Sequence, residues 1–317
     1  MNLAIEIRVP ERNIDVALDL PLGSTTAVLG PNGSGKSSLL AAVGGLLAPG
    51  HGTVKLGDRL LSSAAAPEVW VPPHQRRITL LAQDPRLFPH LDVLDNVAFG
   101  PRSAGQHNRA ARRLAHEWLE RVDAVELAHR HPDTLSGGQA QRIALARALA
   151  TDPDVLLLDE PFAALDVEAA PELRRLLAEL RTGVTTLLVT HDLIDAVALA
   201  DQVVVLAGGR VAEYGATAEV LVRPQSAAAA RAAGLNLIRD GDTLTAFRPS
   251  AVRLFDDGAP TALWTRIEAL EPHGDYIRVR CTDLLADLAP VEVGALSPGD
   301  RVQWEVSPDQ VTRYPAH

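Results

Sequence analysis

The chain has 317 residues, a hydrophobic content of 47% and a formal net charge of -10. Its length favours two domains of unequal size, and the hydrophobic content argues against global disorder. The acidic net charge argues against broad nucleic-acid binding. No stretch is long and apolar enough to span a membrane, and charged residues near the start argue against an N-terminal signal peptide.

Apolar strands alternate with helical stretches through about the first 215 residues. This alternation is typical of an α/β fold in which helices pack on the faces of a parallel sheet. We predict a hairpin that turns at Gly208 and Gly209. The other predicted elements are strands at 25–30, 77–83, 154–160 and 185–192, and helices at 36–47, 109–123 and 137–150.

The pattern changes after residue 215. An alanine-rich stretch, 217–234, predicts a helix, and from Leu235 short alternating segments with turn signals predict a small all-β, OB-like domain of about 80 residues. We therefore expect two domains, 1–232 and 235–317. The only cysteine, Cys281, cannot form an internal disulfide and is expected to be a buried thiol, which fits a reducing cytoplasm.

A glycine-rich loop follows the first predicted strand and matches the pattern G-x-x-x-x-G-K-[ST]. Glycines let backbone N–H groups turn toward a phosphate, and the helix that begins there presents its positive dipole end. The lysine would reach the β- and γ-phosphates, and the first hydroxyl would bind Mg²⁺. By itself the loop indicates only a nucleoside triphosphate, since kinases, GTPases and ATPases all use it. The loop residues are Gly30, Pro31, Asn32, Gly33, Ser34, Gly35, Lys36, Ser37 and Ser38.

Two adjacent carboxylates, Asp159 and Glu160, end the apolar run VLLLDEP. Neighbouring side chains on a strand point to opposite faces, so we expect different roles for them. Asp159 suits the Mg²⁺ shell, and Glu160 suits the polarisation of the water that attacks the γ-phosphate.

Two further polar residues end predicted strands, where ligands bind open α/β sheets. His191 is a candidate for contacting the γ-phosphate and holding the attacking water, although a lone histidine is more often structural. Gln83 is a candidate contact to both the metal and that water, because its neutral amide can move away with its loop.

A second phosphate-binding surface is predicted at LSGGQ, where two glycines precede a helix. It lies more than a hundred residues after the first loop. Two chains arranged head to tail would use both surfaces, with each ATP held between one chain's loop and the partner's Ser136, Gly137 and Gly138.

At this point the chain resembles the ATP-binding-cassette (ABC) family. The glycine-rich loop resembles its Walker A motif, VLLLDEP its Walker B motif, and LSGGQ, which includes Gln139, its signature. Gln83 falls at the Q-loop, Ala164-Leu165-Asp166 resembles the D-loop, and His191 the switch histidine. The resemblance implies a head-to-tail homodimer with two sandwiched ATP molecules. It also implies hydrolysis of ATP with Mg²⁺, and a peripheral place on the cytoplasmic face of the cell membrane.

The segment 71–100 resembles the part of bacterial import ATPases that docks onto membrane permease subunits. Its PP..RRI and RLFPH pieces, with GLNLI at 234–238, are most similar to the ATPases of molybdate importers. The tail resembles the small β domain of oxyanion, iron and polyamine importers. A substrate-binding protein is then an indirect partner.

Three alternatives stay open on the sequence. The imported substrate could be iron(III), sulfate or a polyamine. The chain could instead be a soluble ABC ATPase without a transport role, or a regulator that senses an oxyanion through its tail. One departure from the family concerns adenine: residues 1–30 contain no Phe, Tyr or Trp to stack on the base, and Arg8 or Arg12 are the candidates to replace it.

Overall fold

The structure is a computed structural model that describes residues 2–163, 165–166, 168–180, 183–255, 263–294 and 296–316. The chain divides into two compact units, one ending at Thr217 and the other beginning at Ala218. The helices at 217–222 and 227–232 thus fall with the tail in this division, whereas we assigned them to the ATP-binding domain. The functional boundary at 232–235 stays a prediction.

The first unit is built on a six-stranded sheet with the strand order β11-β10-β3-β9-β8-β7. All neighbouring strands are parallel except β11, which pairs antiparallel with β10. The turn between these two strands lies at Gly208 and Gly209, both with positive φ, as the sequence predicted. The strands are β3 (Thr25–Leu29), β7 (Ile78–Leu81), β8 (Val155–Asp159), β9 (Thr185–Val189), β10 (Gln202–Ala207) and β11 (Arg210–Ala216).

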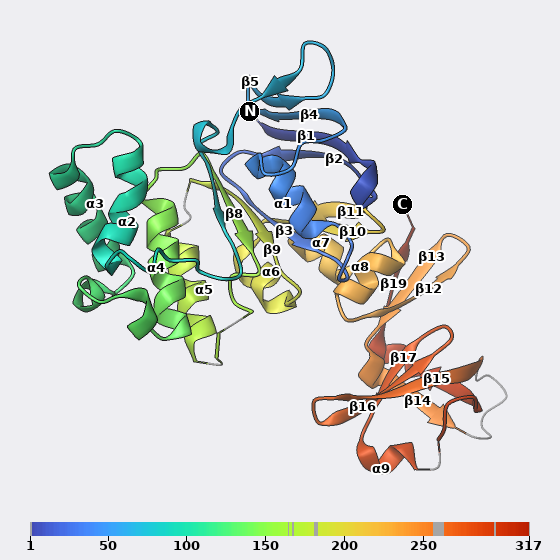
Figure 1. The fold of residues 1–317 in the computed structure, drawn as a ribbon. Coiled ribbons are helices and arrows are strands. Elements are labelled where there is room, and N and C mark those ends of the chain that lie inside the picture. The colour runs from blue at the N-terminus through green and yellow to red at the C-terminus, as the bar shows by residue number, and fades with distance from the viewer. Residues whose placement is uncertain are drawn as a thin grey trace. The chain divides into compact units, whose positions relative to one another are not determined.

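Both faces of this sheet are buried, and β8 shows why. Val155 and Leu157 belong to one hydrophobic cluster, whereas Leu156 and Leu158 belong to another. The first cluster joins the sheet to α1 and to a five-stranded antiparallel sheet, and the second joins it to a group of helices (Figure 1). These helices are α2 (Val93–Ser103), α3 (Asn108–Arg121), α4 (Gly137–Leu149), α5 (Ala169–Leu180) and α6 (Leu193–Leu199).

The antiparallel sheet was not predicted from the sequence. Its strand order is β2-β1-β4-β5-β6, and alternate residues of β1 and β2 are buried. Helix α1 (Lys36–Gly44) ends three residues earlier than predicted, because Gly45 has a left-handed backbone. The strands are β1 (Asn2–Val9), β2 (Ile14–Pro21), β4 (His51–Leu56), β5 (Arg59–Ser63) and β6 (Val69–Trp70).

The second unit contains two antiparallel sheets, with the orders β12-β13-β19 and β14-β18-β15-β16-β17. The larger sheet is strongly curved, since its end strands β14 and β17 contact each other. The predicted helix at 217–234 is two helices, α7 (Thr217–Val222) and α8 (Ala227–Ala232), with Pro224 between them. The other elements are α9 (Pro290–Val293), β12 (Asn236–Asp240), β13 (Thr243–Phe247), β14 (Val252–Phe255), β15 (Leu263–His273), β16 (Tyr276–Cys281), β17 (Leu285–Leu288), β18 (Arg301–Val306) and β19 (Val311–Pro315).

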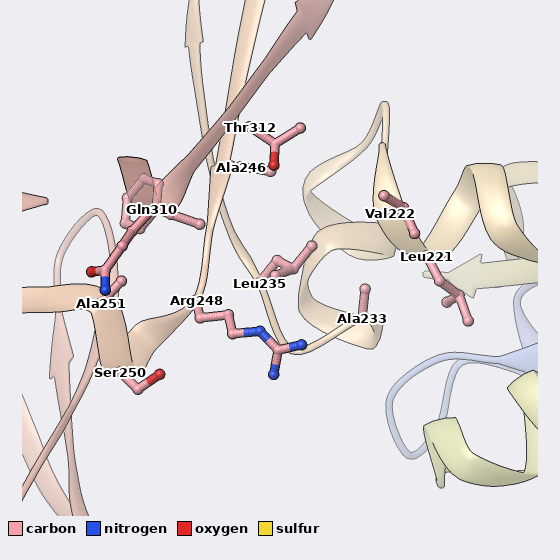
Figure 2. A pocket seen from close by; sticks show the side chains of 11 residues that line it. Leu221, Val222, Ala233, Leu235, Ala246, Arg248, Ser250, Ala251, Gln310 and Thr312 are labelled. Carbon is pink, nitrogen blue, oxygen red and sulfur yellow. The ribbon is translucent and has the colours of Figure 1, made fainter. Parts of the chain in front are cut away.

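A cavity of about 440 Å³ lies within the second unit. Its walls are largely apolar, with Leu221 and Val222 on one side and Leu235 in the middle, and Arg248 extends its guanidinium group toward the open space (Figure 2). Cys281 is buried in the same unit, as predicted. In the part of the chain that the structure describes, no helix is long and apolar enough to span a membrane.

Candidate ATP-binding and hydrolysis site

The glycine-rich loop connects β3 to α1, as predicted, and its backbone can be adopted only with glycine at two points. Gly30 has φ 144°, and a Cβ on it would lie 2.3 Å from the carbonyl oxygen of Leu206. Gly35 has φ 101°, and a Cβ there would lie 2.0 Å from the Cδ1 of Ile14. The two glycines therefore shape the loop and let it lie against its neighbours.

Lys36 is buried and lies at the base of this loop. Its ammonium group donates hydrogen bonds to the carbonyl oxygens of Gly30 (2.8 Å) and Pro31 (3.0 Å). Burial lowers the pKa of Lys36, and the charges of Glu160 and Asp159 act in the opposite direction. The lysine is thus a cation held by weak neutral acceptors, and an anion in the loop would be a stronger partner for it.

A cleft of about 500 Å³ lies along the loop, and Arg12 and Glu160 also line it. The residues that line it include six of the predicted loop. The complete lining is Arg12, Asn32, Gly33, Gly35, Lys36, Ser37, Ser38 and Glu160.

Asp159 and Glu160 do take different directions at the end of β8. The Ser37 hydroxyl donates a hydrogen bond to the Asp159 carboxylate at 3.3 Å. Burial raises the pKa of Asp159, the charge of Glu160 raises it further, and the hydrogen bond from Ser37 lowers it. A hydroxyl and a carboxylate oxygen so close together are a donor pair that Mg²⁺ prefers, and a cation there would offset the cost of burying the charge. The two residues therefore fit a magnesium ion.

Glu160 has a left-handed backbone, with φ 47°, which is unusual for a side chain of this size. Its N–H donates to the carbonyl oxygen of Val189 on the next strand (2.9 Å), which holds this turn in place. The carboxylate lies 3.4 Å from the Nδ1 of His191. The structure therefore brings together two residues that the sequence predicts separately as base and switch.

A second cavity, of about 470 Å³, lies beyond Glu160 and also contains His191 and Asp166. The Asp166 carboxylate accepts hydrogen bonds from the backbone of Glu168 (3.1 Å) and Ala169 (2.7 Å), so it caps the start of α5. Ala164, the first residue of the predicted D-loop, lies outside the described residues. The D-loop prediction is therefore placed at Leu165 and Asp166, which both line this cavity.

Two parts of the predicted site lie apart from the cleft. Gln83 follows the end of β7 at the same edge of the sheet as Glu160, is exposed, and lines neither cavity. Ser136 caps α4 and forms a capping box with Gln139, because the Ser136 hydroxyl accepts from the Gln139 N–H (3.3 Å) and Ser136 N–H donates to the Gln139 side chain (3.0 Å). The N–H groups of Gly137 and Gly138 belong to the first turn, which has no intrahelical acceptors.

The structure separates the two arginines that were candidates for the adenine end. Arg12 lines the cleft, and its guanidinium donates to the Ser38 hydroxyl at 3.4 Å. Arg8 lies on β1, opposite Asp15 and His51, and is not among the residues that line the cleft.

Sequence reasoning missed one group of side chains around the second cavity. Arg174 on α5 contacts the carboxylates of Asp192 and Asp195, which follow His191 in the chain. No spacing rule joins a helix residue to carboxylates 18 and 21 positions later, so no signal in a single sequence pointed to this contact.

Comparison with known proteins agrees with this site. The family model described as "ABC transporter" matches residues 14–163. The molybdenum import ATP-binding protein ModC of Mycobacterium tuberculosis is 40% identical over 99% of this chain and 97% of its own length. The chain belongs to the ABC transporter family. The resemblance predicted from the sequence is confirmed.

Other members of the ABC transporter family match a smaller part of the chain. A sulfate/thiosulfate import ATP-binding protein of Rhizobium meliloti is 48% identical over 67% of this chain and 58% of its own length. An Fe(3+) import ATP-binding protein of Pseudomonas fluorescens is 44% identical over 67% of this chain and 59% of its own length.

Solved ABC structures confirm the predicted fold class. One is the dimeric post-hydrolysis state of an ATP-binding cassette with ADP and Pi, which has a TM-score of 0.59 and 28% identity and covers 68% of this chain and 99% of its own. Another is cbiO1 from Clostridium perfringens, part of the transporter complex cbiONQ, with a TM-score of 0.62 and 29% identity over 70% of this chain and 90% of its own. As an ABC cassette, the chain binds nucleotide.

Proposed function

We propose that this chain is the ATP-hydrolysing subunit of an ABC importer and that the imported substrate is molybdate. The observation that carries the substrate is the extent of the ModC match. That match covers 99% of the chain, including the second unit, whereas the sulfate and iron relatives match about two thirds of it. A likeness in the cassette alone would not separate these importers, since all of them hydrolyse ATP.

The chemistry we assign uses the residues around the cleft. The loop amides and Lys36 bind the phosphates, and Ser37 with Asp159 holds Mg²⁺, which neutralises charge on the β- and γ-phosphates when it is bound. Glu160, at the edge of the cleft and 3.4 Å from His191, is the general base that takes a proton from the attacking water. His191 orients that water and the γ-phosphate.

We further propose that the working unit is a head-to-tail homodimer. In this dimer the first turn of α4, at Ser136 to Gly138, faces the γ-phosphate bound by the partner's loop. The capping box uses the N–H groups of Ser136 and Gln139 and leaves those of Gly137 and Gly138 for an anion. The dimeric state of the ADP-bound relative supports the arrangement.

The permease contact belongs, in this proposal, to the segment 71–100 on the cytoplasmic face of the membrane. Phe99 is 40% exposed, and its ring packs against Phe88 with centroids 4.5 Å apart. Asn96 is fully buried and holds the backbone of Phe88 by hydrogen bonds in both directions. An exposed aromatic on helix α2 that packs against a firmly held loop is a suitable anchor for a partner helix.

Growth at limiting molybdate tests the substrate. Cells that lack this protein should lose molybdoenzyme activity at low external molybdate and regain it at high molybdate. Wild-type protein should restore activity and the Lys36→Ala variant should not, which ties the effect to ATP. Normal molybdoenzyme activity together with impaired iron, sulfate or polyamine uptake would contradict molybdate. Normal uptake of all four would favour a soluble ATPase or an oxyanion sensor instead.

A further inference from the structure

The second cavity is bordered by a network of ion pairs that the chemistry above does not use. Arg174, with a side chain 17% exposed, lies on α5 at the centre of it. Its Nε is 2.5 Å from the carboxylate of Asp195, and its Nη2 is 3.1 Å from that of Asp192. Two separate carboxylates thus share one guanidinium, which is the geometry in which arginine is least replaceable.

Asp195 connects this network to the residue before the switch histidine. It is only 2% exposed, and both of its oxygens are used: one accepts from Arg174 and the other from the Thr190 hydroxyl at 2.5 Å. The Thr190 hydroxyl in turn accepts from the N–H of Asp192 at 3.0 Å. The turn that carries His191 is therefore held on both sides by groups that depend on Asp195.

Arg174 also contacts the segment that follows Glu160, the other member of the catalytic pair. Its guanidinium lies 5.3 Å from the ring centre of Phe162, two residues after Glu160. The helix that carries Arg174 begins at the turn capped by Asp166. One side chain therefore connects three segments, those of Glu160, Asp166 and His191, through contacts with their neighbours Phe162, Asp192 and Asp195.

We propose that Arg174 is a positioning residue that sets His191 against Glu160 for hydrolysis. The proposal rests on the function proposed above. The two side chains are 3.4 Å apart although they come from different strands, and Glu160 keeps an unfavourable left-handed backbone. His191 is itself 65% exposed, so packing around its ring is too sparse to fix its direction. The residues before and after His191 are instead held by hydrogen bonds. Arg174 contacts Asp192 directly and reaches Thr190 through Asp195.

Loss of the guanidinium should then affect turnover more than nucleotide binding. In the proposed function the loop and Lys36 bind the phosphates, and these residues line the cleft, whereas Arg174 lines the second cavity. We expect Arg174→Gln to lower kcat by on the order of 10- to 100-fold, the effect of a small misplacement of catalytic groups, and to leave KM for ATP within about twofold. Arg174→Lys should recover part of the loss, because it keeps a charge near Asp195 but not the forked geometry.

A second variant covers the case in which Arg174→Gln does not fold. Combining Arg174→Gln with Asp195→Asn leaves no uncompensated buried charge and should restore the melting temperature but not kcat. Arg175→Gln is the matched control: it is the next residue on α5, has a side chain 72% exposed and pairs with Glu179 at 3.0 Å. It should leave kcat and KM unchanged.

A double-mutant cycle with His191 decides between positioning and mere stability. If Arg174 acts through His191, the kcat loss caused by Arg174→Gln should disappear in a His191→Ala background. A full loss in that background, or a lowered melting temperature with unchanged kcat, would overturn the proposal, and so would a His191→Ala variant that turns over normally. Absence of ATP hydrolysis by the wild-type chain would instead overturn the proposed function, so the two failures are distinguishable.

Discussion

The two cavities that meet at Glu160 are built by different means. The nucleotide cleft is shaped by backbone: glycines with positive φ curve the loop, and Lys36 is held by carbonyl oxygens of that same loop. The second cavity is shaped by side chains that lie far apart in the sequence, above all Arg174 and Asp195. One side is therefore local and mostly neutral, and the other is long-range and ionic.

The two cavities should differ in how well they tolerate substitution. Backbone amides cannot be removed by changing a side chain, so the cleft should tolerate most changes except at its glycines and at the few groups that meet the phosphates or the water. The second cavity should be less tolerant, because loss of one charged side chain there leaves its buried partners unpaired.

Lys36→Ala should reduce ATPase activity to background. The variant loses the only buried cation of the loop among the described residues that line the cleft, and neutral amides cannot neutralise the β- and γ-phosphates to the same extent. Phosphate release from ATP is the measurement, with Lys36→Met as a variant closer in volume. Hydrolysis near the wild-type rate in either variant would show that the cleft works without its lysine.

Glu160→Gln should nearly abolish hydrolysis while ATP binding persists. The amide keeps the shape and hydrogen-bonding capacity of the carboxylate but cannot act as the base. In the proposed dimer, hydrolysis of the ATP held between the two chains allows them to separate. The variant should therefore accumulate as an ATP-bound dimer, which light scattering with ATP would detect.

Ser136→Arg provides the control for that dimer. A bulky side chain at the start of α4 would block the γ-phosphate bound by the partner. Adding Ser136→Arg to Glu160→Gln should therefore dissociate the ATP-bound dimer into monomers. A Glu160→Gln chain that stays monomeric with ATP at micromolar concentration would contradict the dimer, and one that hydrolyses normally would contradict the role of Glu160.

Arg76→Met should lower the free energy of unfolding by about 3 kcal/mol, since it leaves buried acceptors unpaired. Arg76 is fully buried and donates to the carbonyls of Ala42 and Val43 near the end of α1, and to that of Val71 after β6. Burial lowers its pKa, but the backbone acceptors keep it in place. Arg76 thus supports the helix that follows the glycine-rich loop, and urea unfolding measures its contribution.

Arg77→Met is the matched control. Arg77 is the adjacent residue, with a side chain 53% exposed, and it forms ion pairs with Asp152 and Asp154 at the surface. Surface pairs contribute roughly 0–1 kcal/mol. Equal losses from the two variants would mean that burial of the Arg76 network adds no stability beyond an ordinary surface pair.

Local features of the fold could be predicted from the sequence, whereas features built from distant side chains could not. The strands before Gly30, before Asp159 and before His191 are short, apolar and followed by polar residues, and all three were predicted within a few positions. The loop and the signature turn were predicted because consecutive residues determine both. Their proposed roles in binding and catalysis stay predictions until the variants above are measured.

The remaining features depend on contacts that periodicity does not report. The antiparallel sheet was missed although alternate residues of β1 and β2 are buried, because Pro10 and the turn after it interrupt the pattern. The predicted helix at 217–234 disregarded Pro224, which separates α7 from α8. The Arg174–Asp195 pair could not be predicted, since it forms only when α5 packs beside α6.

The smallest expected effect concerns the choice of base. Arg12 and Glu160 both line the cleft, and the cleft lining contains no aromatic residue. If the γ-phosphate lies at Glu160, we expect the base at Arg12, whose guanidinium can stack on any purine. We expect GTP to compete within about tenfold of ATP, which corresponds to a difference of ~1.4 kcal/mol or less.

Calorimetric titrations with ATP, GTP and tripolyphosphate would show whether Arg12 contacts the base or a phosphate. If it stacks on the base, Arg12→Ala should weaken ATP but not tripolyphosphate, and Arg12→Tyr should restore ATP binding, because an aromatic contact of this kind contributes about 0.5–1.5 kcal/mol. Arg8→Ala should change neither ligand, since Arg8 does not line the cleft. If Arg12→Ala weakens tripolyphosphate equally and tyrosine does not rescue, Arg12 is a phosphate ligand. A preference for ATP of several hundredfold would require a hydrogen-bonding group at the purine edge. In that case a side chain, rather than the backbone of the loop, would determine the selectivity for adenine.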